Sequence, residues 1–99
     1  MAGNKILVVA SFKSKAGTQG QLKTVLQKMA REASKDRGCL RFELAQNEND
    51  DTLFIFSECW ESRKHLENHL KMPYISLYRN ERKPFLDGDP QVSTWIVVS

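Results

Sequence analysis

The sequence predicts one α+β domain with its elements in the order β-α-β-β-α-β. The chain has 99 residues, which suits a single domain spanning residues 1–99. Four segments show the apolar alternation of strands, and the segments between them show apolar residues at helical spacing. Hydrophobic residues make up 40% and charged residues 27% of the chain, a mixture that excludes a disordered chain or a coiled coil.

The first third of the chain predicts a strand and a helix. Residues 5–13 are apolar on both alternating faces, as in a well-buried strand. Thr18 is suited to cap a helix whose apolar positions follow at i, i+3, i+4 and i+7, and Gly38 is suited to end it. This apolar stripe consists of Leu22, Val25, Leu26, Met29, Ala30 and Ala33.

The middle of the chain predicts a β-hairpin followed by a short helix. Residues 39–46 alternate, and a polar turn at 47–51 separates them from a strand over residues 52–60. The apolar face of the first hairpin strand consists of Leu40, Phe42 and Leu44. Ser62 then caps a helix over residues 63–71.

The last third predicts a second helical piece and a final strand. Pro73 ends or restarts the preceding helix, a helical piece covers residues 74–82, and a strand covers residues 91–98. This order is that of ferredoxin-like folds. The helices can cover one face of such a sheet, yet its strands carry apolar residues on both faces. We therefore expect a homodimer packed sheet to sheet, because monomers seldom expose a large apolar patch.

Charge and apolar runs exclude several classes of protein. The net charge of +3 is spread along the chain, whereas nucleic-acid binding needs a concentrated basic stripe, so no nucleic acid is expected. The longest apolar run, residues 6–10, is too short to cross a membrane, so we expect a cytoplasmic protein with no membrane partner. A hairpin symmetric about Asn49 would place Cys39 opposite Cys59, but thiols stay reduced in the cytoplasm.

Two histidines lie one helical turn apart in the helix predicted over residues 63–71. The spacing of His65 and His69 can bind zinc, but Glu67 does not follow the first histidine as a metalloprotease requires, so no metal is expected. Leu66 and Leu70 define the buried side of this helix. His69 therefore borders the core, as a pocket residue or as an ordinary boundary residue, while His65 leans toward solvent.

An acidic residue shares one face of the predicted strand 52–60 with aromatic residues. Glu58 and Trp60 lie on that face, so Glu58 is either an acid–base group with a raised pKa or a carboxylate that reaches an arginine or a helix N-terminus. Tyr74 and Tyr78 stand four residues apart. They are core or interface residues, or contacts to a ligand near His69.

Residues 58–73, ECWESRKHLENHLKMP, resemble the antibiotic biosynthesis monooxygenase family. The family pattern of E-x-W-x-S, a helix containing His and then Pro is present in full. Residues 38–44, GCLRFEL, are similar to the family's second strand, and residues 15–17 are similar to its turn after the first strand. The resemblance covers nearly the whole chain and is nearest to the small bacterial quinol monooxygenases.

The resemblance implies a dimeric α+β barrel with a pocket between each sheet and its helices. It implies oxidation of a quinol or of a polycyclic phenolic or anthrone-type substrate by dioxygen, with no cofactor. His69 is the natural base or proton shuttle, because its ordinary pKa lies near neutrality, and Glu58 is the second catalytic candidate. The residues expected to contact substrate are Trp60, Tyr74, Tyr78, His65 and Phe42. Tyr74 stands where many relatives carry His, so a second base from that position is not expected.

Two alternatives stay open. The chain is also compatible with a non-catalytic ferredoxin-like ligand-binding or regulatory module that has lost the chemistry, or with a family relative that processes a phosphorylated signalling sugar. Haem degradation is disfavoured, because Arg79 occupies the place where haem-degrading relatives carry the ligating histidine.

Overall fold

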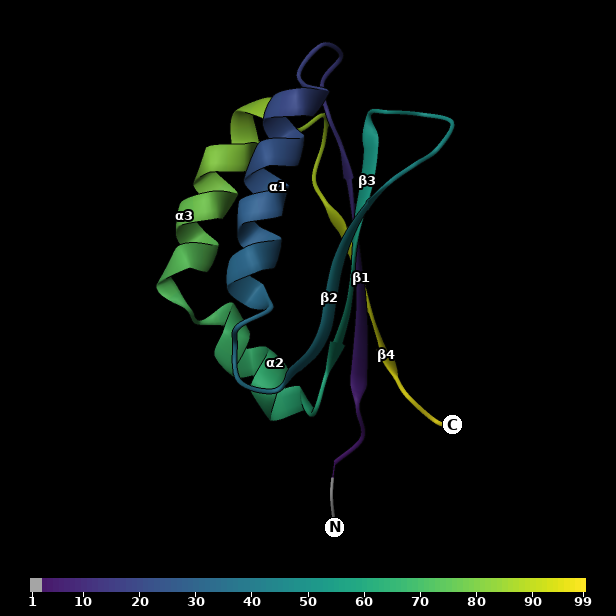
Figure 1. The fold of residues 1–99 in the computed structure, drawn as a ribbon, viewed down its shortest axis with the longest axis vertical. Helices are drawn as coiled ribbons and strands as arrows, with labels where there is room; N and C mark the ends of the chain where they lie inside the picture. The colour runs from purple at the N-terminus through teal and green to yellow at the C-terminus, as the bar shows by residue number, and fades with distance from the viewer. Residues whose placement is uncertain (1–2) are drawn as a thin grey trace.

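Four antiparallel strands form one sheet in the order β2-β3-β1-β4 (Figure 1). The computed structural model describes residues 3–99. The strands are β1 (Ile6–Lys13), β2 (Cys39–Gln46), β3 (Leu53–Trp60) and β4 (Gln91–Ile96). This strand order and the intervening helices confirm the ferredoxin-like α+β fold predicted from the sequence. Strand β4 ends two residues earlier than predicted.

The helices all lie on one face of the sheet, which we call the inner face (Figure 1). They are α1 (Gln19–Ala33), α2 (Arg63–Leu70), α3 (Pro73–Arg82) and the single 3₁₀ turn η1 (Lys83–Phe85). Pro73 occupies the first turn of α3, where its missing N–H breaks no helical hydrogen bond. No helix within residues 3–99 is long and apolar enough to cross a membrane.

The inner face holds the core. Alternate residues of β1 and β3 point toward the helices and are buried, and Trp60 at the end of β3 is fully buried. They meet the predicted stripe of α1, of which all but the half-buried Ala30 are buried. Phe42 of β2 packs against two clusters of core residues, one around Phe56 and one around Trp60. The cavity described below lies beside this junction.

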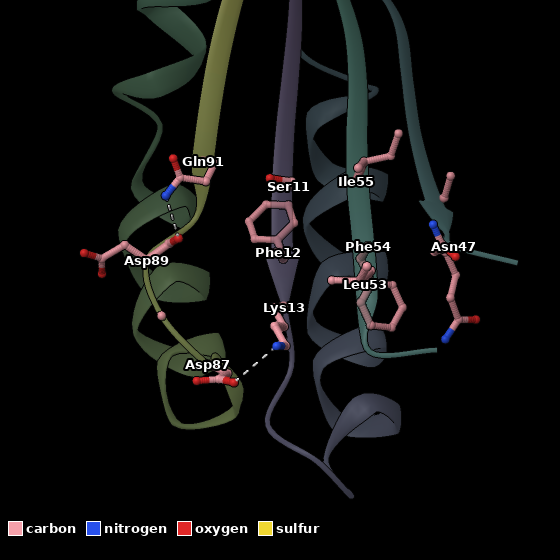
Figure 2. A pocket seen from close by; sticks show the side chains of 13 residues that line it. Ser11, Phe12, Lys13, Asn47, Leu53, Phe54, Ile55, Asp87, Asp89 and Gln91 are labelled. Atoms are coloured by element: carbon pink, nitrogen blue, oxygen red, sulfur yellow. Dashed lines mark hydrogen bonds and ion pairs between the residues drawn. The ribbon is translucent and has the colours of Figure 1, made fainter. Parts of the chain in front are cut away.

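Among the residues that the structure describes, no helix or further strand covers the other, outer face of the sheet. Val9, Ile55 and Trp95 lie there, each more than a third exposed. Figure 2 looks onto this face, with the strands in front of the helices. A hollow of about 640 Å³ opens at one end of it and is lined in part by Leu53 and Ile55. The charged residues of its rim are exposed to solvent, like the pair Lys13–Asp87.

The role predicted for Gly38 is wrong. Helix α1 ends at Ala33, and Ser34 follows as its C-cap in a right-handed conformation. Gly38 lies in the next turn, with φ of +84°, a conformation that favours glycine. A Cβ atom at this position would also collide with the ring of His65. Gly38 therefore permits the contact between this turn and α2.

The predicted register of the hairpin is also wrong, because Phe42 pairs with Glu58, whereas a hairpin symmetric about Asn49 would pair it with Phe56. A bulge between Cys39 and Arg41 removes Leu40 from the face that Phe42 shares, and Leu40 is 51% exposed. Cys39 lies opposite Trp60, whereas Cys59 pairs with Arg41. The two cysteines are therefore not cross-strand partners, and both are free thiols.

Candidate active site

A cavity of about 110 Å³ lies between the inner face and the helices. Within residues 3–99, Glu58 and His69 are the buried side chains that titrate, at 6% and 5% exposure, and both line this cavity. Phe42 and Phe56 supply aromatic walls, and α3 contributes arginines. The fold thus brings the two residues that the sequence predicted as catalytic into one apolar enclosure.

Helix α2 places His69 by the way it begins. Ser62 is the N-cap, and its hydroxyl accepts a hydrogen bond from the backbone N–H of His65 at 3.3 Å. The buried residues of α2 are Leu66 and His69, three positions apart. Leu70, which the sequence predicted to be buried, is 46% exposed. The buried side of the helix is therefore rotated toward His69, which lies deeper than predicted.

His69 belongs to a three-residue polar network. Its Nδ1 lies 2.7 Å from Oδ2 of Asp36 and 3.0 Å from the hydroxyl of Tyr74, and that hydroxyl donates to the same Oδ2. An ionised carboxylate only accepts hydrogen bonds, so the proton between His69 and Asp36 belongs to Nδ1. In the neutral ring Nε2 then carries the free lone pair and is the basic atom.

Asp36 is the part of this network that the sequence did not reveal. It lies in the turn after α1, 33 residues before His69, in a polar stretch with no periodic pattern. No local signal connects the two positions, because only the packing of that turn against α2 brings them together. Tyr74, which begins α3 just after Pro73, was predicted near His69 but as a substrate contact.

Trp60 links the two buried titratable residues. Its ring lies face to face with that of His69, tilted by 31°, with centroids 4.4 Å apart. Its indole Nε1–H donates to Oε1 of Glu58 at 2.9 Å. Burial raises the pKa of Glu58 to about 7, against the lowering effect of the bond from Trp60. Among the described residues, the partner of this carboxylate is therefore an indole rather than an arginine or a helix N-terminus.

Burial also shifts the pKa of His69, in the opposite direction. Desolvation lowers the pKa of the imidazole, the hydrogen bond and charge of Asp36 raise it, and the charge of Arg79 lowers it. The net shift is downward, so His69 is neutral at pH 7 and able to accept a proton. The cavity wall thus holds a neutral imidazole and a carboxyl group close to its own midpoint of titration.

The sequence of this chain matches the model of one known family. The sequence model described as Antibiotic biosynthesis monooxygenase matches residues 5–81. The chain belongs to the antibiotic biosynthesis monooxygenase family. The match runs from β1 through most of α3, and so covers nearly all the elements that build the cavity.

Solved structures place the antibiotic biosynthesis monooxygenase fold over the whole chain. PA3566 from Pseudomonas aeruginosa superposes with a TM-score of 0.91 at 18% identity, covering 100% of this chain and 99% of that one. A candidate antibiotic biosynthesis monooxygenase from Caulobacter crescentus superposes with a TM-score of 0.90 at 20% identity, covering 98% and 92% of the two chains. At these identities the likeness shows the fold.

A curated relative is longer than this chain. The uncharacterised protein sll1783 from Synechocystis is 26% identical over 89 residues, which is 90% of this chain and 60% of that protein. The chain therefore spans about 60% of the length of the curated relative that it matches.

Four of the five predicted substrate contacts do not line the cavity of this family member. Trp60 is fully buried behind His69, and Tyr78 packs against the core cluster around Phe56. Tyr74 contributes its hydroxyl to the network at Asp36 instead. Phe42 alone of the five lies in the cavity wall. Three of the four predicted aromatic contacts therefore pack around the site, and one lines the cavity.

His65, the remaining predicted contact, is held outside the cavity. Its Nδ1 lies 2.7 Å from the hydroxyl oxygen of Ser62, and its ring packs on Gly38. Within residues 3–99 no group of three or more His, Cys, Asp or Glu side chains is arranged to hold a metal ion. The two histidines of α2 thus have separate hydrogen-bond partners.

Proposed function

We propose that this chain is a monooxygenase that oxidises a hydroquinone-type phenol with dioxygen and needs no cofactor. The observation that carries the proposal is His69, a neutral imidazole in the wall of an apolar cavity. Its Nδ1 is held by Asp36, which leaves Nε2 as a base. Family membership supports oxygenase chemistry, and the cavity supports a small aromatic substrate.

The chemistry requires a base more than anything else. Dioxygen reacts slowly with closed-shell molecules, but a phenolate is electron-rich enough to reduce it. His69 takes the hydroxyl proton through Nε2, and the Asp36 carboxylate stabilises the imidazolium that forms. One oxygen atom then enters the ring and the other leaves as water, so a hydroquinone and dioxygen give a hydroxyquinone and one water molecule.

The size of the cavity distinguishes between the quinol and anthrone classes. An engineered cavity of about 150 Å³ in another protein accommodates benzene, so about 110 Å³ suits no more than one buried aromatic ring. Three fused rings of an anthrone would require side chains to move. The dimensions therefore favour a single-ring quinol over a polycyclic substrate.

Oxygen uptake by the purified chain tests the proposal. Single-ring hydroquinones, naphthalenediols and anthrones would be supplied in turn, with autoxidation measured without protein. We expect one dioxygen consumed per substrate molecule, fastest for single-ring hydroquinones, with the hydroxyquinone identified by mass spectrometry. Uptake no faster than autoxidation for every class would overturn the proposal and favour the non-catalytic module.

We also propose that a second copy of the chain covers the outer face of the sheet. The exposed apolar residues Val9, Ile55 and Trp95 on three neighbouring strands support this. Light scattering should give about twice 11.4 kDa.

A substitution on the outer face tests the dimer. Ile55→Asp should shift the mass to that of one chain, because it would bury a charge between the two sheets. Leu77→Asp on α3, where the leucine is 60% exposed, is the matched control that should leave the dimer intact. A monomeric wild-type chain would contradict this proposal.

A further inference from the structure

Two arginines of α3 line the cavity without an acidic partner. Arg79 and Arg82 stand three residues apart on the helix, so both side chains project to the same side. Within residues 3–99, neither forms an ion pair. The guanidinium of Arg82 lies 4.9 Å from the ring centre of Phe12, and its other polar contact is the sulfur of Met29 at 3.7 Å.

This arrangement is unfavourable for an empty protein. A half-buried guanidinium loses part of its hydration, and neither an aromatic ring nor a thioether replaces it as a carboxylate would. Burial and, to a smaller extent, the charge of Arg79 together lower the pKa of Arg82 to about 10. Two like charges are thus held beside each other at the cavity, where an anion would relieve both costs.

Within residues 3–99, the acidic side chain of the cavity wall is not paired with either arginine. Glu58 is the acidic residue among its lining, and its Oε1 accepts the hydrogen bond from Trp60. The charge of Arg79 reaches His69, since it contributes to lowering the pKa of that imidazole. Arg79, Arg82 and His69 line the same cavity, so one bound molecule can contact the guanidinium groups and the imidazole together.

We propose that the substrate is a hydroquinone bearing a carboxylate, which Arg79 and Arg82 bind where the cavity opens to solvent. This rests on the function proposed above and specifies its substrate class. Arg79 is exposed and Arg82 half-buried, so the carboxylate stays at the entrance while the ring enters beside Phe42. The planar guanidinium matches a carboxylate through paired hydrogen bonds. The same contact directs one ring hydroxyl toward His69.

Anaerobic calorimetric titration of the full chain tests this without turnover. The probes are 2,5-dihydroxybenzoate and its methyl ester, which differ chiefly in charge. We expect the acid to bind at least about tenfold more tightly than the ester, with a preference that shrinks as salt is added. A ligand without an aromatic ring, ribose 5-phosphate, tests whether any anion suffices.

Arginine variants test whether Arg79 and Arg82 cause the tighter binding of the acid than of its methyl ester. Arg82→Met and Arg79→Met should each reduce this preference to about threefold or less, whereas Arg82→Lys should retain only part of it, because the charge remains but the paired hydrogen bonds are lost. Arg31→Met, which removes an exposed arginine from α1, is the matched control and should leave the preference unchanged. Thermal unfolding of each variant would identify any loss that comes from misfolding.

The outcomes separate this inference from the proposed function. Equal binding of acid and ester overturns the carboxylate preference, even where neutral hydroquinones still drive oxygen uptake. Tighter binding of ribose 5-phosphate than of the aromatic acid also overturns it. A preference for the acid that vanishes in Arg82→Met, in a protein that consumes no oxygen, would support the binding site while refuting the oxygenase proposal.

Discussion

The first and last turns of α2 each carry a histidine, and the two have opposite environments. His65 lies partly in solvent, with Nδ1 beside the hydroxyl of Ser62. His69 is buried, with Nδ1 beside the carboxylate of Asp36 and its ring on Trp60. One residue type, one turn apart, thus serves to secure the start of a helix and to furnish a candidate base.

The difference arises from a single turn of chain. Residues 34–38 follow α1 and pack against α2, where Gly38 meets His65 and Asp36 meets His69. The first contact is one of shape, since glycine leaves room for a ring. The second is one of charge, since a carboxylate fixes the tautomer of the ring. The chemical role of a histidine is therefore set here by what the neighbouring turn presents to it.

Replacement of His69 should have the largest effect on activity. Removing a general base commonly costs 10²–10⁴-fold in rate, so His69→Ala should reduce kcat for a hydroquinone at least about 100-fold. Oxygen uptake measures the rate, and light scattering verifies that the oligomeric state is unchanged. His65→Ala is the matched control in the same helix. Equal and mild losses in the two variants would mean that neither histidine is the base.

The pH dependence of stability tests whether the Glu58 carboxyl, in the same cavity as His69, is shielded from solvent. A carboxyl whose folded pKa of about 7 exceeds its unfolded value binds more protons when folded, so its contribution to stability is lost as pH rises through that window. Glu58→Gln removes this pH-dependent contribution to stability. The free energy of unfolding should fall between pH 5 and 7 by about 2 kcal/mol more in the wild type than in the variant. Urea unfolding measures both, and parallel pH dependences would show that Glu58 is solvated.

Replacement of Asp36 tests whether its negative charge affects catalysis by His69. Asp36→Asn keeps the shape but removes the charge that raises the pKa of His69, and its amide can donate to Nδ1 and reverse the tautomer. We expect kcat to fall about tenfold or more, and the acidic limb of the pH–rate profile to move to lower pH. An unshifted profile would restrict Asp36 to a structural role.

The sequence predicted elements whose pattern is local. The strands at β1 and β3 and the stripe of α1 were found because apolar periodicity is set by which face is buried. The same reasoning placed His69 nearer the core than His65, although His69 is more deeply buried than predicted. These features require no knowledge of what the helix packs against, only that one side of it is covered.

What escaped prediction depends on contacts between distant segments. Asp36 has no periodic signal, and its role exists only because its turn meets α2. The exposure of Leu70 and the bulge at Leu40 depend on how α2 and the β2–β3 hairpin pack against neighbouring elements. Arg79 was noted as the wrong residue for haem ligation, but which side of α3 faces the cavity is fixed by packing. Such positions require the tertiary structure.

His65→Ala should have the smallest effect and completes the comparison. The variant loses the contact between the imidazole Nδ1 and the Ser62 hydroxyl, but Ser62 still accepts from the backbone N–H of residue 65, so the helix keeps its cap. The free energy of unfolding should therefore fall by about 1 kcal/mol or less, as for one partly exposed hydrogen bond. Urea unfolding measures this loss, and oxygen uptake should stay within about twofold of wild type, since the ring does not line the cavity. A large loss of activity with unchanged stability would show that His65 acts in catalysis, and would contradict the different roles assigned to the two histidines of α2.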